Sequence, residues 1–152
     1  MVAYIDVLFW FASLYILPIW GLMWFMPTHE RTKQLMNNEW LFLTPLLTAY
    51  VLAVIPNLAD LLIALSSDMP TPDLVADLFS TREIALVAWL HFLAFDTLAG
   101  KMTWSRLMKA EKPIQITMPI LFLSMMVAPL GYLLGQYVTR DLINPVTEPI
   151  AA

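Results

Sequence analysis

Four long apolar runs constrain the fold of this 152-residue chain more than any other feature. They extend over about residues 5–26, 40–65, 84–104 and 114–138. Because an α-helix rises about 1.5 Å per residue, each run is long enough to cross a hydrocarbon core of about 30 Å. Hydrophobic residues make up 60 % of the chain and charged residues only 13 %, which excludes a water-soluble domain. We therefore predict an all-α fold: a polytopic membrane protein whose single domain, residues 1–152, is a bundle of four transmembrane helices.

The positions of the basic residues predict how these helices are oriented. Most of them lie between the first and second runs, or in the segment from the end of the third run to the start of the fourth: Arg31, Lys33, Lys101, Arg106, Lys109 and Lys112. Arg82 and Arg140 are at the opposite ends of the runs. Because basic loops stay in the cytoplasm, we expect both termini on the non-cytoplasmic side of a bacterial inner membrane or a photosynthetic membrane. The segment 69–81 has apolar residues at helical spacing and is expected to lie along the outer membrane surface.

Composition excludes several classes of function. A net charge of −4 and the absence of a clustered basic surface argue against nucleic acid as a partner. The chain has no cysteine, so thiol catalysis and iron–sulfur clusters are excluded, and its two histidines cannot form a multi-histidine iron site. No nucleotide-binding motif is present, so we expect no cofactor and no metal. Cofactor-free acid–base chemistry on an apolar substrate, binding without chemistry, and a structural role in membrane lipid remain.

Small residues line one face of the fourth run. They lie within about 60° of one another on a helical wheel and comprise Thr117, Ser124, Ala128, Gly131 and Gly135. Such a stripe lets helix backbones approach closely in lipid. We expect it to pack inside the monomer; a homodimer contact is the alternative.

The third run carries two ionisable side chains, His91 and Asp96, at the borders of a sector that contains Phe92 and Phe95. Five residues on a helix turn through about 140°, so the two side chains cannot hydrogen-bond directly, although both can point at one space between helices. A charge at mid-membrane costs at least about 2.5 kcal/mol. Asp96 must therefore be protonated, paired or beside water, and its expected partner is Lys101 or a basic residue of another helix.

Polar residues also occur on the first two runs. Asn57 and Asp60 share one face of the second run, and Asp6 and Trp10 share one face of the first. We expect both faces to point into the bundle. Asp6 and Asp60 lie near the outer boundary, where solvation or a pair with Arg82 is favoured over a chemical role.

Trp10, Phe92 and Phe95 form an aromatic stripe across the first and third runs. Helix packing is the simpler interpretation of these side chains. Contact with a pigment is the alternative.

The string Trp89-Leu-His91-Phe-Leu-Ala-Phe-Asp96, followed by Gly100-Lys101, resembles the W-x-H-x-x-x-x-D-x-x-x-x-R signature of the abscisic-acid-deficient-four-like family. That family comprises small four-span membrane proteins, and its plant members are required to make neoxanthin from violaxanthin. Lys101 stands where the family usually has arginine, which removes the planar guanidinium fork. Similarity extends to Leu17 through Pro27 and to Ala128 through Gly131, so it covers nearly the whole chain.

This resemblance implies an isomerisation, because the conversion of a carotenoid epoxide to an allenic alcohol involves no net redox change. It needs only an acid and a base. A protonated Asp96 would donate a proton to the epoxide oxygen, and neutral His91 would accept one from the polyene end group. The residues expected to bind the carotenoid, or another long apolar ligand, are Trp89, Phe92, Phe95, Lys101, Asn57, Asp60 and Trp10. The competing interpretation is a non-catalytic subunit that binds pigment or helps to assemble a larger, photosynthetic membrane complex.

Overall fold

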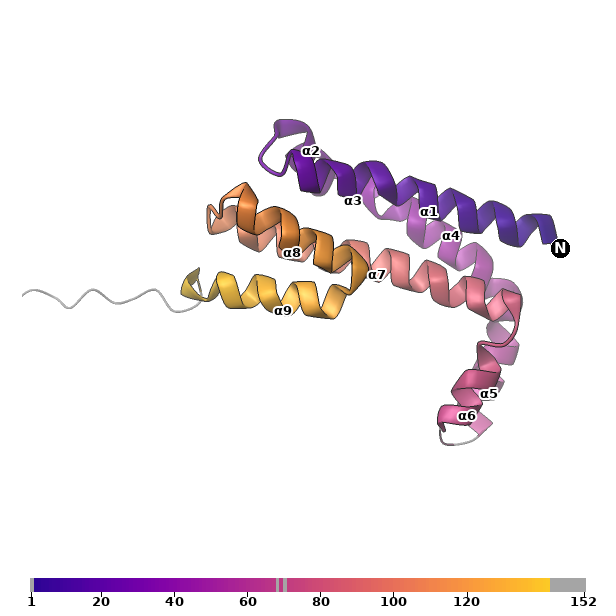
Figure 1. Ribbon diagram of the computed structural model, residues 1–152. Coiled ribbons are helices and arrows are strands. Elements are labelled where there is room, and N and C mark those ends of the chain that lie inside the picture. The colour runs from indigo at the N-terminus through magenta and orange to yellow at the C-terminus, as the bar shows by residue number, and fades with distance from the viewer. Residues whose placement is uncertain (1, 68, 70, 143–152) are drawn as a thin grey trace, which may run out of the picture. The chain divides into compact units, whose positions relative to one another are not determined.

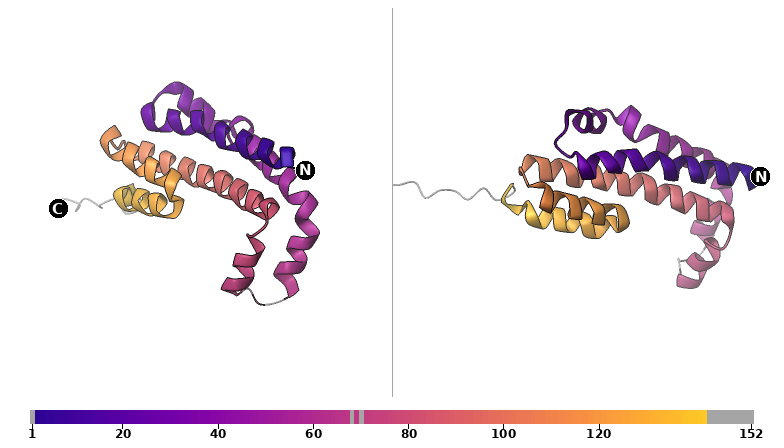
Figure 2. Two further views of the ribbon diagram at one scale, coloured as in Figure 1. Left: turned by 45° about the vertical axis from the view of Figure 1, so that its right-hand side comes forward. Right: turned by 45° about the horizontal axis from the view of Figure 1, so that its top comes forward.

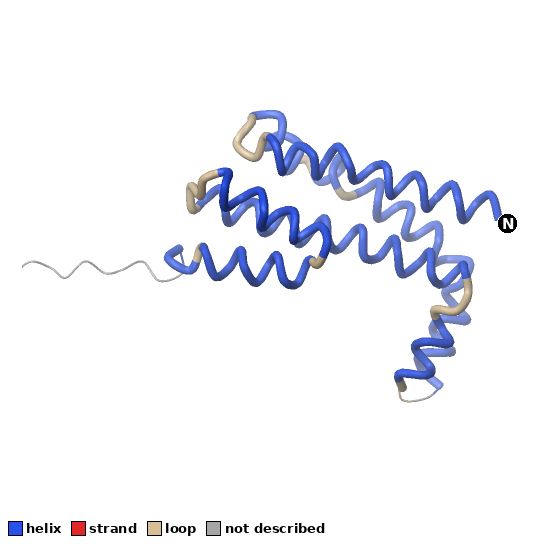
Figure 3. The backbone as a smooth tube through the Cα atoms, in the orientation of Figure 1, coloured by secondary structure: helices blue, strands red, loops and turns tan. Residues whose placement is uncertain are grey.

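The computed structural model describes residues 2–67, 69 and 71–142, and throughout these residues it contains helices and turns but no strand (Figure 3). The all-α prediction is confirmed. The elements are α1 (Val2–Phe25), α2 (Glu30–Asn37), α3 (Glu39–Phe42), α4 (Thr44–Val54), η1 (Ile55–Asn57), α5 (Leu58–Ser67), α6 (Pro72–Leu78), α7 (Arg82–Lys109), α8 (Ile114–Met126), α9 (Ala128–Val138) and η2 (Arg140–Leu142). Figure 1 labels α1 to α9. They form two compact units. The first comprises the chain up to Ile19 and residues 37–95, and the second comprises residues 20–36 and the chain from Asp96 onward.

Three of the predicted spans coincide with helical segments that are long and apolar enough to cross a membrane: Ala3–Phe25, Thr44–Ile63 and Arg82–Lys109. The second of these is composite, because the short 3-10 turn η1 joins α4 to α5. Pro56 lies in this turn and has no N–H to donate to the preceding helical turn. The first and third spans are single helices, α1 and α7, and each contributes to both units.

The fourth predicted span requires correction, because 114–138 is not one continuous helix. α8 ends at Met126 and α9 begins at Ala128, and Val127 between them has φ −145° and ψ 80°, outside the helical region. Pro129 follows two residues later and cannot donate a helical hydrogen bond. With 13 and 11 residues, α8 and α9 are about 20 Å and about 17 Å long. Each is too short to cross a core of about 30 Å alone.

Instead, α8 and α9 pack side by side as a hairpin, as all three ribbon views show (Figures 1 and 2). The stripe of small residues forms their contact. Thr117 and Ser124 of α8 are completely buried, and Gly131 and Gly135 of α9 are buried too. A Cβ atom on Gly131 would overlap the Ser124 backbone, and one on Gly135 would lie 2.7 Å from Thr103 Cγ2 of α7. The prediction that this stripe packs inside the monomer is confirmed.

The rest of the second unit is built on the second half of α7. Trp20 of α1 is buried, and its indole ring fills the space beside Gly100, where a Cβ would collide with it. Trp104 Nε1 donates a hydrogen bond of 2.9 Å to the Pro27 carbonyl, so the turn that follows α1 is attached to α7. Thr32 Oγ1 donates to the Met26 carbonyl at 2.7 Å and closes that turn.

The end of α9 is attached to the end of α7. Thr139 is buried, and its hydroxyl accepts a hydrogen bond of 3.5 Å from Arg106 Nε. Arg106 and Lys109 are the basic residues of the last turn of α7. The hairpin thus begins and ends at the basic end of the second unit. The prediction that both termini lie on the non-cytoplasmic side assumes a single crossing by 114–138, and it stays a prediction.

We expect cysteines introduced at Lys109 and Asp141 to react with a membrane-impermeant maleimide from the same side of the membrane. The chain has no native cysteine, so each single substitution reports one position. A cysteine at Asp77 in α6, before α7 crosses, provides the opposite-side control. Labelling of Asp141→Cys together with Asp77→Cys, and opposite to Lys109→Cys, would show that 114–138 crosses the membrane once.

We expect Gly131→Ala to destabilise the protein by about 1–3 kcal/mol, because the added methyl group meets helix backbone rather than a side chain that can turn away. Gly21→Ala is the matched control. An added Cβ at Gly21 of α1 would meet no atom within 4 Å, so that change should be neutral or slightly stabilising. Thermal unfolding in detergent measures both variants, and equal melting temperatures would contradict the close approach of α8 and α9.

Candidate functional site

The first half of α1 packs along the first half of α7, and the two helices run in the same direction. Arg82 Nη2 donates a hydrogen bond of 2.9 Å to Asp6 Oδ1, and Trp89 Nε1 donates one of 3.0 Å to Ser13 Oγ. Both pairs are 76 residues apart along the chain, so the helices stay in register over two turns. The Phe9 ring stacks on Trp89 between them, with centroids 5.6 Å apart. Of the two alternatives expected for Asp6, solvation or a pair with Arg82, the structure shows the pair.

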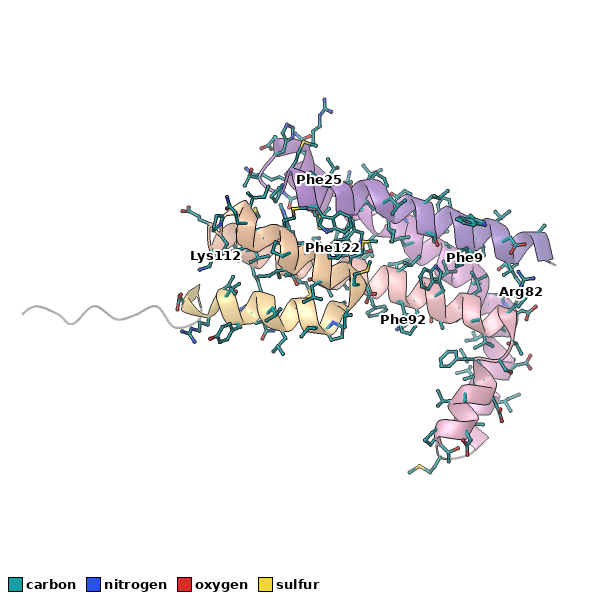
Figure 4. All side chains as sticks on the ribbon, in the orientation of Figure 1. Phe9, Phe25, Arg82, Phe92, Lys112 and Phe122 are labelled. Atoms are coloured by element: carbon teal, nitrogen blue, oxygen red, sulfur yellow. The ribbon has the colours of Figure 1, made fainter. Side chains whose placement is uncertain are left out.

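A pocket of about 450 Å³ lies along this contact, within the size range of small-molecule sites. Its lining residues come only from α1 and α7: Ile5, Asp6, Phe9, Trp10, Arg82, Ala85, Leu86 and Trp89. Figure 4 labels Phe9 on α1 and Arg82 at the start of α7. Two residues predicted to bind substrate, Trp10 and Trp89, are therefore brought together. The pocket has aromatic walls and one ion pair at its polar end.

A second pocket of about 250 Å³ contains another of the predicted residues. It is lined by Tyr4, Ile5, Ala53, Pro56, Asn57, Glu83 and Leu86, from α1, the α4–η1 region and α7. Asn57 Nδ2 donates to the Ala53 carbonyl at 3.0 Å, so its amide nitrogen stabilises the turn at Pro56. Asp60 lies one turn further along, in α5, and is exposed. This exposure agrees with a solvated Asp60 carboxylate rather than with a chemical role for that side chain.

His91 takes part in a separate aromatic cluster on the α4 side of α7. Its ring stacks on Phe95 with centroids 4.5 Å apart and planes 19° apart, and the Tyr50 ring of α4 is 5.7 Å away. His91 follows Trp89 by two residues, which is about 200° around a helix. His91 therefore projects from the face of α7 opposite to the pocket shared with α1. The structure brings His91 and Phe95 together but separates them from Trp10 and Trp89.

The side chains of the predicted aromatic stripe, Trp10, Phe92 and Phe95, are not buried by helix packing. Exposed fractions are 59 % for Trp10, 55 % for Phe92 and 54 % for Phe95. Trp10 borders the pocket, and Phe92 projects on the side of α7 away from α1 (Figure 4). In a membrane, these rings face lipid or a lipid-soluble ligand rather than another helix of the described chain.

Asp96 and Lys101 lie on the part of α7 that belongs to the second unit, whereas His91 belongs to the first. Asp96 is half-buried, and it precedes Gly100, which contacts Trp20, by one helical turn. Lys101 is half-buried as well. The pairing of Asp96 with Lys101 stays a prediction. Among the described residues there is no cluster of three or more His, Cys, Asp or Glu side chains that could hold a metal ion.

A family model described as ABA DEFICIENT 4-like matches residues 7–134. The chain belongs to the ABA4-like family. The match begins in the first turns of α1, includes the whole Trp89–Asp96 motif, and ends in α9. The family resemblance predicted from the motif is confirmed, and the family supports a carotenoid-related membrane protein. No individual curated protein and no solved structure matches the chain significantly.

The sequence reasoning did not predict the pocket between α1 and α7. A signal for it was available, because Asp6 precedes Ser13 by seven residues and Arg82 precedes Trp89 by the same interval. Two parallel helices with matching seven-residue intervals can align two polar contacts at once. Phe9, which lies between the two contacts on α1, was not identified as a site residue.

We expect the Asp6–Arg82 ion pair to contribute little to stability. The side chains are 50 % and 61 % exposed, and exposed pairs are typically worth about 0.2–1 kcal/mol. A double-mutant cycle with Asp6→Ala and Arg82→Ala, followed by unfolding in detergent, measures the coupling energy. A coupling above about 2 kcal/mol would make the pair a structural element of the α1–α7 contact.

Proposed function

We propose that this protein modifies a carotenoid within the membrane, by an isomerisation of the end group that needs no redox cofactor. The observation that carries the proposal is the family match over residues 7–134, which contains the Trp89–Asp96 motif. That motif lies on the single helix α7, inside a span long and apolar enough to cross the membrane. A lipid-soluble substrate can therefore reach it from the hydrocarbon core.

The reaction proposed is the rearrangement of a carotenoid epoxide to an allenic alcohol. A hydrogen on the polyene carbon next to the epoxide leaves as a proton, and a new carbon–carbon double bond forms there. The adjacent carbon–oxygen bond breaks, and the oxygen takes up a proton. Atoms and electrons balance without an oxidant or a reductant, so one acid and one base suffice.

Asp96 and His91 are the proposed acid and base. Asp96 is half-buried in the middle of a span, and the proposal assigns to its carboxyl group the role of proton donor. His91 stacks on Phe95, which restricts the rotation of its ring and leaves the side chain exposed. The exposed rings of Phe92 and Phe95 offer an apolar surface to a polyene.

A pigment-binding or assembly subunit is the second candidate function. The exposed aromatic side chains within the spans favour it, because such a surface suits contact with a pigment or with another membrane subunit. This role needs no proton transfer, so it makes no demand on the carboxyl group of Asp96.

We expect Asp96→Asn to abolish carotenoid conversion while the protein stays folded, because the amide keeps the size of the side chain but cannot donate a proton in the same way. The loss should be about 10²–10⁴-fold, the usual contribution of general acid–base catalysis, and His91→Gln should also lower the rate. The assay expresses each variant in bacteria that accumulate violaxanthin and separates the extracted pigments by chromatography. Asp77→Asn in α6, an exposed carboxyl group, is the matched control.

Two outcomes would contradict this assignment. Normal conversion by a stable Asp96→Asn protein would exclude the acid role of Asp96. No conversion by the wild-type protein, together with violaxanthin that co-purifies with it, would favour the pigment-binding subunit.

A further inference from the structure

The pocket between the first halves of α1 and α7 has rigid aromatic walls. Phe9 stacks on Trp89 and meets Trp10 edge to face, with ring centroids 5.6 Å and 5.5 Å apart. The hydrogen bond from Trp89 Nε1 to Ser13 Oγ fixes the indole ring. Preformed flat walls of this kind suit a flat or cyclic apolar group, because the side chains need not be ordered when the ligand binds.

The polar end of the pocket can donate hydrogen bonds. A guanidinium has five N–H donors, and the contact with Asp6 uses one nitrogen of Arg82. With 61 % of its side chain exposed, Arg82 can present further N–H groups to a ligand in the pocket. Ala85, on the same wall, leaves room beside the guanidinium because its side chain is a single methyl group.

The pairing of Arg82 with Asp6 restricts the charge of the ligand. The carboxylate balances the guanidinium, so the polar end is close to neutral and gives an anionic headgroup little net attraction. A purely hydrocarbon chain would remove water from the Asp6–Arg82 pair without offering hydrogen bonds in its place, and this loss of hydration is unfavourable. A neutral ligand with an apolar ring and an acceptor oxygen satisfies both the walls and the donors.

We propose that this pocket binds the oxygenated end ring of a carotenoid, with Arg82 donating a hydrogen bond to its hydroxyl or epoxide oxygen. The proposal rests on the proposed function, because it takes a carotenoid to be the ligand, and it adds a site distinct from His91 and Asp96. Phe9, Trp10 and Trp89 hold the ring, and Asp6 orients the guanidinium. The pocket would thus select carotenoids by the oxygen on their end ring.

Two pigments with the same carbon skeleton test this proposal. Violaxanthin carries hydroxyl and epoxide oxygens on its end rings, and β-carotene carries none. Binding of each to the purified full-length protein in detergent is followed by pigment absorbance after gel filtration over a range of pigment concentrations. We expect the wild-type protein to bind violaxanthin about tenfold more tightly than β-carotene, as one charge-assisted hydrogen bond allows.

Arg82→Met keeps the aliphatic stem but removes every donor, so it should weaken violaxanthin binding about tenfold and leave β-carotene binding within about twofold. Ala85→Trp should lower the affinity for both pigments, because the indole fills the pocket from the α7 side. The same substitution at Ala76, exposed in α6, is the control for a bulky ring elsewhere. Thermal unfolding of each variant tests folding, and Ala85→Leu replaces Ala85→Trp where the larger side chain lowers stability.

The outcomes separate the pocket from the general function. If the wild-type protein binds both pigments equally and Arg82→Met changes neither, the pocket assignment is wrong although the protein binds carotenoids. If Ala85→Trp and Ala85→Leu both fold and bind violaxanthin normally, the ring binds elsewhere. If the wild-type protein binds neither pigment, the proposed function itself loses its support and the pocket assignment falls with it.

Discussion

The parallel contact between α1 and α7 is the constraint on which the rest of the structure depends. In the first unit it is made by Asp6 with Arg82 and by Ser13 with Trp89, and in the second unit by Trp20 against Gly100. Just after α1, the Pro27 carbonyl accepts a hydrogen bond from Trp104 of α7. Two helices that run in the same direction require a return crossing between them, which the composite span of α4 and α5 supplies. Tyr4 of α1 donates a hydrogen bond to the backbone carbonyl of Leu52 in α4, and Tyr15 donates one to that of Leu41 in α3, so the return segment and the helix before it are both attached to α1. The α1–α7 contact also creates the aromatic pocket, so the candidate binding site and the helix arrangement have a common origin.

Hydropathy alone predicts most of this fold, because the thickness of the hydrocarbon core sets the length of the apolar run that a spanning helix needs. It predicted three long apolar helical segments correctly, but it could not detect the break in the fourth run, since α8 and α9 are apolar on both sides of Val127. Proline was not a sufficient signal either. Pro18 and Pro119 lie inside continuous helices, whereas Pro56 lies in a 3-10 turn and Pro129 follows a complete break. What distinguishes the last case is the packing of α9 against α8 through Gly131, a tertiary contact that a single run of sequence does not contain.

The candidate site was predictable to a different degree. The Trp89–Asp96 motif could be read directly and led to the family, which the match over residues 7–134 confirms. The sequence did not predict which aromatic side chains lie on which face of α7. Trp89 and His91 are neighbours in sequence but project from opposite faces of α7, and which face meets α1 depends on partners 76 residues away. Polar contacts between helices set that rotation, and the apolar character of the run leaves it undetermined.

The hairpin of α8 and α9 has a consequence for how the chain enters the membrane during synthesis. A helix that crosses the bilayer after α7 would require Arg140 and Asp141, which follow it, to be translocated to the other side of the membrane. The hairpin begins after Lys112 and ends at Thr139, beside Arg106, so its two ends are at the same end of α7. It can therefore insert as a unit, with its small-residue seam already closed and without translocating the charged residues that follow it.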